Sequence, residues 1–193
     1  MIQFTPRLHR ALDLAALAHN GQVRKDPGLA IPHVAHVCGV AFLLAGHGFG
    51  EDVVVAGLLH DVLEDSPRFE PELRAFGDRV HAIVRQVSEA AKGAPWRERK
   101  VRYANALREA WPEAKAVSCA DKIHNMQSIL LSIERGRPVW PVLTNTDPLE
   151  QVQRLVWLRD ALADGWDHPI LASYDATLAR LAPEARKAAR GAR

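Results

Sequence analysis

The sequence has little of several features that define whole classes of protein. Its two cysteines, Cys38 and Cys119, are too few for a disulfide framework, which favours a reduced, cytoplasmic protein. No apolar run approaches the roughly 20 residues that a membrane helix needs, and the first residues, MIQFTPRLHR, lack the apolar core of a secretory signal. We therefore expect neither a disulfide-rich secreted protein nor a membrane protein.

Net charge is also small. The 25 Lys and Arg residues are nearly balanced by 23 Asp and Glu residues, which gives a formal net charge of +2. That balance does not indicate a nucleic-acid-binding protein, so any site for a highly anionic small molecule must gather its positive charge locally. The composition, 48% hydrophobic and 25% charged, is that of an ordinary globular domain, and it does not predict the oligomeric state.

Aromatic residues make up only 6%, and segments rich in Ala, Leu, Arg and Glu favour helices throughout. The first helix is expected to begin at Thr5-Pro6 and to end at Asn20-Gly21. Further helices are predicted at 33–46, 51–65, 78–91, 95–110, 113–134, 148–164 and 169–181. We predict one all-α domain over 1–193, with a connection at 135–148 and a solvated basic tail at 182–193. The apolar run 53–59 predicts that helix 51–65 lies at the centre of the domain.

The densest group of reactive side chains follows that apolar run and comprises His60, Asp61, Glu64 and Asp65. Adjacent helical residues lie about 100° apart, so His60 and Asp61 can converge on one ion. Glu64 and Asp65 follow four residues later and stack over them. Burying three acids without a cation would be costly, so the pattern favours a metal site over the alternative of a solvated helix end.

Two weaker groups can complete such a site. Asp121 and Asn125 are four residues apart and share one helical face, although such a pair is more often a surface pair. His36 precedes an apolar helical pattern, where a histidine is more often hydrogen-bonded than bound to metal. Cys38 and Cys119 lie in apolar helical contexts and are expected to be small buried thiols rather than ligands.

Together these pieces resemble the HD-domain phosphohydrolases. Within that superfamily they resemble the (p)ppGpp hydrolase domain of the RelA/SpoT group and its stand-alone small alarmone hydrolases. Five collinear stretches within 18–126 carry the resemblance: AHNGQVRK, IPHVAHVCGVA, LLHDVLED, WRERK and ADKIHNM. The resemblance implies an HD-domain helical bundle that acts in the stringent response. It also implies metal-dependent hydrolysis of the 3′-pyrophosphate of (p)ppGpp, releasing pyrophosphate and GDP or GTP.

The same resemblance implies the roles of individual residues. The metal, usually manganese in this family, would be held by His36, His60, Asp61 and Asp121. The acidic pair that orients and deprotonates the attacking water would be Glu64 and Asp65. The residues expected to contact the nucleotide are Arg24, Lys25, Asn125 and, more loosely, the basic pair Arg99 and Lys100. A solvated helix face is the alternative for that basic pair, and His19 and Gln22 are expected to support the loop rather than to catalyse.

His33 is the main departure from the family pattern, which usually has Tyr at this position. We count His33 among the substrate-binding residues, where it would stack on the base in place of Tyr or compete for the metal. The change leaves open whether guanine is preferred to adenine. Alternatives to the alarmone hydrolase are another HD-type nucleotidase or NADPH phosphatase and, from a different class, a non-catalytic nucleotide-sensing module. The complete set of ligand and acidic positions disfavours the sensing module.

Overall fold

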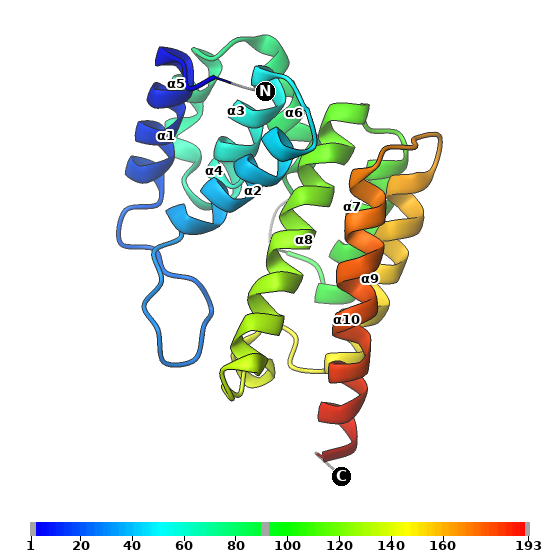
Figure 1. Ribbon diagram of the computed structural model, residues 1–193. Helices are drawn as coiled ribbons and strands as arrows, with labels where there is room; N and C mark the ends of the chain where they lie inside the picture. The colour runs from blue at the N-terminus through cyan, green and yellow to red at the C-terminus, as the bar shows by residue number, and fades with distance from the viewer. Residues whose placement is uncertain (1–2, 90–92, 192–193) are drawn as a thin grey trace.

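The computed structural model describes residues 3–89 and 93–191, which form a helical bundle around one long helix (Figure 1). That helix, α8 (Pro112–Glu134), packs against α2 (Val34–Gly46), α3 (Glu51–Leu59) and α6 (Asp78–Val87). On its other side lie α9 (Pro148–Ala163) and α10 (Ile170–Gly191). The remaining long helices are α1 (Pro6–Ala18), which packs on α3, and α7 (Trp96–Arg108), which packs on α9.

The predicted all-α class is confirmed. In 3–89 and 93–191 the only β-pairing is an isolated bridge between Val23 and Pro32, which closes the loop between α1 and α2. The hydroxyl of Thr5 accepts a hydrogen bond from the N–H of Leu8 and Pro6 occupies the first turn, so α1 begins as predicted. No described helix combines the length and the apolar character needed to span a bilayer.

Helix α3 lies in the hydrophobic core, as the apolar run predicts. Every residue from Val53 to Leu59 is buried. Gly57 has a packing role, because a Cβ at this position would lie 2.5 Å from Cδ1 of Leu44 on α2. The absence of a side chain at Gly57 therefore lets α2 and α3 approach closely, three residues before His60.

The predicted single helix over 51–65 is wrong, because the chain breaks at His60-Asp61 and resumes as α4 (Val62–Asp65). The ring of His60 turns back to donate from Nδ1 to the carbonyl oxygen of Gly57, 2.8 Å away. Asp61 has φ −89° and ψ −5°, which departs from regular helical angles, and it immediately precedes α4. Pro67 ends α4 as expected, and two short elements follow, the 3₁₀ turn η1 (Pro67–Phe69) and α5 (Glu70–Arg74).

The end of the chain also differs from expectation. Helix α10 continues through Pro183 to Gly191, so the basic tail predicted from 182 is part of a helix over 182–191, while 192–193 lie outside the described residues. Leu181 and Ala185 are both buried, and this packing continues across the proline. Helix α6 ends at Val87, earlier than predicted, and positions 90–91 of that prediction lie outside the described residues. The connection before α9 contains a short 3₁₀ turn, η2 (Trp140–Val142).

Candidate active site

Two imidazoles and two carboxylates meet where α2, α8 and the break between α3 and α4 come together. Nε2 of His36 lies 3.2 Å from Oδ1 of Asp121 and 3.7 Å from Oδ2 of Asp61. Nε2 of His60 lies 3.3 Å from Oδ1 of Asp61 and 3.9 Å from Oδ1 of Asp121. Ligands that each lie about 2.0–2.2 Å from one ion are about 3–3.5 Å apart. The structure therefore brings the four expected metal-binding side chains to a spacing that suits one ion.

The hydrogen bonding of His60 fits a metal at this point. Its Nδ1 carries the proton donated to Gly57, so Nε2 carries the lone pair. That Nε2 atom is buried and has no hydrogen-bond partner, which is unusual for a buried polar atom. Burial also lowers the pKa of His36 to about 3, which keeps its imidazole neutral. Both rings thus offer a free lone pair toward the carboxylates, as ligands of a divalent cation must.

The two carboxylates remain ionised in spite of their surroundings. Burial opposes ionisation of Asp121, but the charge of Lys122 and the neighbouring imidazoles outweigh it and hold its pKa well below the ordinary value. The Lys122 ammonium contacts the Asp121 carboxylate and lies 5.5 Å from the centre of the Tyr103 ring. Lys122 was not predicted from the sequence, although its position next to Asp121 was an available signal.

His124 is a second site residue that was not predicted from the sequence. Nδ1 of His36 lies 2.9 Å from Nδ1 of His124, and since Nε2 of His36 faces the carboxylates, His36 donates this hydrogen bond. The ring of His124 packs on Gly39, where an added Cβ would come within 2.2 Å of Cδ2. A partner on the second nitrogen fixes the orientation of a metal-binding histidine, so His124 acts as a positioning residue for His36. It stands one residue before Asn125 in the ADKIHNM stretch.

A cavity of about 530 Å³ opens beside these side chains, between the loop 19–33, α8, α7 and α9. Positively charged side chains from several elements line this cavity. The lining residues that matter most for an anionic ligand are Arg24, Lys25, Lys100, Asn125 and Arg154. The cavity thus joins the histidine–aspartate cluster to a basic wall. A net charge of only +2 is therefore compatible with an anionic ligand, because the positive charge is local.

The basic residues expected from the sequence differ in their contacts. Arg24 donates to the side-chain oxygen of Asn125 at 2.6 Å, and the Lys25 ammonium contacts the hydroxyl of Thr144. Lys100 and Arg99 both pair with Glu89, and of these two only Lys100 belongs to the cavity lining in the described part of the chain.

Arg154 on α9 lines the cavity although no motif pointed to it. Its Nε is buried without a hydrogen-bond partner, which leaves this donor free for a ligand. The sequence offered no signal for Arg154, because its position depends on how α9 packs against the rest of the bundle.

The acidic pair Glu64 and Asp65 occupies two different environments. Asp65 is exposed, lines the cavity and accepts a hydrogen bond from the side-chain amide of Gln22 at 2.7 Å. Glu64 accepts from the backbone N–H of Glu89 at 2.6 Å and is not among the described residues that line the cavity. Burial raises the pKa of the Glu64 carboxyl to about 7. The structure therefore places one acid at the cavity and the other behind it.

His33 is oriented toward the metal-binding cluster rather than toward open solvent. It is buried, its Nε2 lies 2.9 Å from Oδ2 of Asp61, and its ring centre lies 4.5 Å from that of His19. It also belongs to the wall of the cavity. Nδ1 of His19 in turn lies 2.7 Å from Oε1 of Gln22.

The fold and the site define a helical domain with a histidine–aspartate cluster that could hold a metal ion. The sequence profile of the HD domain family matches residues 11–138, and the chain belongs to that family. Mouse (Mus musculus) guanosine-3′,5′-bis(diphosphate) 3′-pyrophosphohydrolase MESH1 is 36% identical over 126 residues, which are 64% of this chain and 69% of the mouse protein. The family expected from the sequence is therefore confirmed.

Solved structures give the same result. The structure of a metazoan orthologue of SpoT, described as hydrolysing ppGpp, superposes with a TM-score of 0.74 and 27% identity. The superposition covers 93% of this chain and 98% of the orthologue. The Listeria monocytogenes protein lmo0812 superposes with a TM-score of 0.67 and 32% identity, over 74% of this chain and 96% of the Listeria protein. The first of these matches extends well beyond the family motifs and includes the C-terminal helices.

Proposed function

We propose that this protein is a metal-dependent hydrolase that removes the 3′-pyrophosphate of (p)ppGpp and releases pyrophosphate and GDP or GTP. The observation that carries the proposal is the histidine–aspartate cluster beside a basic cavity of about 530 Å³. The relatives named as guanosine-3′,5′-bis(diphosphate) 3′-pyrophosphohydrolases support this substrate. Such a hydrolase would lower the alarmone level in a stringent response.

The metal would be held by His36, His60, Asp61 and Asp121, and we propose Mn²⁺ as the native ion. Two imidazoles and two carboxylates suit a divalent transition metal and leave positions open for oxygen ligands. When bound, such an ion supplies electrophilic activation of water and of a phosphoryl oxygen. The unpartnered Nε2 of His60 is the feature of the chain that best supports a cation at this point.

The basic wall would bind the phosphates of the nucleotide. Arg24 and Lys25 from the loop, Lys100 from α7 and Arg154 from α9 present positive charge to the cavity from different directions. The planar guanidinium of Arg24 can pair with two phosphate oxygens or stack on the base, and Asn125 holds it in place. His33 would contact the substrate from the part of the cavity wall beside Asp61.

The acidic pair, Glu64 and Asp65, would carry out the proton transfer of the reaction. Water attacks the 3′ phosphorus, the new P–O bond forms as the bond to the 3′ oxygen breaks, and the 3′ oxygen gains a proton. Glu64 lies behind the cavity wall and burial raises its pKa to about 7, so near neutral pH it would take up the proton of the water by way of Asp65. Asp65, held by Gln22 at the edge of the cavity, would orient the water. The free thiols Cys38 and Cys119 support a reducing, cytoplasmic setting. The basic cavity of about 530 Å³ favours small nucleotides rather than nucleic acid as partners.

A small nucleotide panel tests this function. The protein is incubated with ppGpp, NADPH and GMP, with Mn²⁺ or with a chelator, and released pyrophosphate and orthophosphate are measured separately. We expect Mn²⁺-dependent release of pyrophosphate from ppGpp, and its loss in Asp61→Asn. Orthophosphate from NADPH or GMP without pyrophosphate from ppGpp would instead identify a phosphatase or nucleotidase. No product from any of the three would identify a nucleotide-sensing module.

A further inference from the structure

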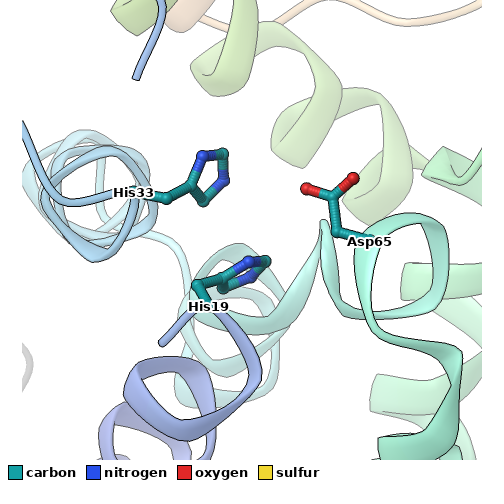
Figure 2. A group of neighbouring side chains, drawn as sticks. All are labelled: His19, His33 and Asp65. Carbon is teal, nitrogen blue, oxygen red and sulfur yellow. The ribbon is translucent and has the colours of Figure 1, made fainter. Parts of the chain in front are cut away.

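A second group of potential metal ligands lies beside the first. His19 follows the end of α1, His33 immediately precedes α2, and Asp65 ends α4, and in Figure 2 their polar groups point toward a common space. One donor atom from each residue lies within 4.8 Å of the other two. His19 and His33 are buried, with 3% and 8% of their surfaces exposed, whereas Asp65 is open to the cavity. The group is therefore enclosed on its histidine side and accessible on its carboxylate side.

The hydrogen bonds around His19 leave a lone pair pointing into this group. Gln22 donates from Nε2 to Oδ2 of Asp65, so its oxygen faces Nδ1 of His19 at 2.7 Å and can only accept a hydrogen bond from it. Nε2 of His19 is therefore unprotonated in the neutral ring, and it is buried without a hydrogen-bond partner. Burial lowers the pKa of His19, which favours the neutral form.

His60 at the first site has the same arrangement. In both histidines Nδ1 donates to a carbonyl or amide oxygen, and Nε2 is the buried atom that lacks a partner. Within residues 3–89 and 93–191 these are the two imidazole nitrogens in that condition. A donor bond on one ring nitrogen is the usual support for metal binding through the other. Gln22 supports His19 and Asp65 together, as an outer partner of two ligands would.

We propose that His19, His33 and Asp65 hold a second divalent transition-metal ion next to the first. Two imidazoles and one carboxylate on one side of an ion form a ligand set that suits such metals and leaves positions open for oxygen ligands. Asp61 lies between the two sites, with Oδ1 3.3 Å from Nε2 of His60 and Oδ2 2.9 Å from Nε2 of His33. Paired metal ions can hold the attacking and leaving oxygens of a phosphoryl transfer together. His33, which stands where the family has Tyr, completes this set.

The test counts metal in the full chain with Mn²⁺ alone as the probe. Protein purified metal-free is reconstituted with excess Mn²⁺, desalted and analysed for bound manganese and by electron paramagnetic resonance. We expect two Mn²⁺ per chain with a spin-coupled signal in the wild type. His33→Phe and Asp65→Asn should each retain one Mn²⁺ with the signal of an isolated ion. His9→Phe removes an exposed histidine of α1 and should keep two.

One bound Mn²⁺ in the wild type would overturn the proposal, and so would two in both His33→Phe and Asp65→Asn. Thermal unfolding of each variant shows that it is folded, and His33→Phe retains a ring of similar size at a buried position. The metal count is independent of the proposed function. One Mn²⁺ together with pyrophosphate release from ppGpp would reject only the second site, whereas two Mn²⁺ without pyrophosphate release would reject only the substrate.

Discussion

Side chains that are adjacent in the sequence make different contacts at this site. Glu64 and Asp65 are consecutive, yet Asp65 accepts from Gln22 at the cavity while Glu64 accepts from the backbone of Glu89. His60 and Asp61 are also consecutive, and both turn toward the same point because the helix opens between them. The break in the helix thus separates the metal-binding pair from the acidic pair.

Glu64→Gln should slow turnover by at least about 10²-fold, because positioned proton transfer typically contributes about 10²–10⁴-fold. The amide oxygen can still accept the N–H of Glu89, so the fold and the manganese content should not change. The measurement is kcat for pyrophosphate release beside metal analysis, with Glu98→Gln on the exposed side of α7 as the control. A Glu64→Gln protein that has lost its manganese would show that Glu64 is a ligand.

Arg154→Met should raise KM for ppGpp about tenfold or more while kcat changes little. A charge-assisted hydrogen bond to phosphate contributes about 1.5–3 kcal/mol, and its loss weakens substrate binding before the chemical step. Arg159→Met is the matched control, because Arg159 lies on the same helix and pairs with Asp175. Unchanged KM in Arg154→Met would exclude this residue from the phosphate-binding wall.

Many individual site residues could be predicted from residues that lie close to one another in the sequence. Asp121 and Asn125 lie at helical spacing on α8, whereas His60 and Asp61 converge at a break between two helices. The structure brings His60, Asp61 and Asp121 together with His36. Lys122, His124 and Arg154 were not predicted. Their importance arises from contacts with side chains on other elements, which no local pattern reports.

At the scale of elements, the contact between α2 and α8 holds His36, the proposed metal ligand on α2, in place. The ring of His124 on α8 packs against Gly39 of α2, and His124 accepts a hydrogen bond from His36. The position of one ligand on α2 therefore depends on a glycine one turn away on the same helix. This link makes an otherwise ordinary helix residue part of the support of the site.

Gly39→Ala should weaken Mn²⁺ binding by about 10–100-fold, the usual effect of disturbing an outer partner of a ligand. The added Cβ would lie 2.2 Å from Cδ2 of His124, so the ring must move away from His36. Isothermal titration with Mn²⁺ measures the affinity. Gly46→Ala, at the end of the same helix with open space around it, is the control and should bind normally. Equal affinities in the two variants would show that His124 does not position His36.

The elements themselves were predictable where capping and apolar periodicity agree, as at Thr5-Pro6 and in the buried run of α3. They were mispredicted where tertiary contacts override the local pattern. The turn of His60 back to Gly57 breaks a helix that the apolar pattern continues. In α10 the opposite happens, because packing on α8 and α9 carries the helix across Pro183.

On the scale of the whole molecule, Asp26 ties the loop 19–33 to the far end of α8. Its carboxylate accepts from the hydroxyl of Ser132 at 2.8 Å and from Arg137 at 2.6 Å. Burial opposes ionisation of Asp26, but these two partners outweigh it and lower its pKa below the ordinary value of 3.8. The loop that carries Arg24 and Lys25 is therefore anchored by an ionised carboxylate.

Asp26→Asn should unfold at lower urea concentration than the wild type at pH 7. A carboxyl with a lowered pKa in the folded state stabilises the fold above its unfolded-state pKa, and that contribution disappears as the pH falls through the folded-state value. The difference between the two proteins should therefore be constant from pH 6 to 8 and shrink below about pH 4. Urea midpoints across this range measure it, and a difference that persists unchanged at pH 2.5 would contradict the assignment.

Helix α8 presents different residues to its two sides, and this has a consequence for how such proteins can diverge. Asp121 faces the metal site, while Cys119, two residues or about 200° away, is buried with its thiol 3.8 Å from the carbonyl oxygen of Ile170 on α10. A larger side chain at Cys119 would shift α8 and move Asp121 with it. Across evolution, substitutions in the C-terminal helices α9 and α10 are therefore expected to be accompanied by substitutions in α8. Lineages that replace α9 and α10 should differ first in the small residues on that face of α8.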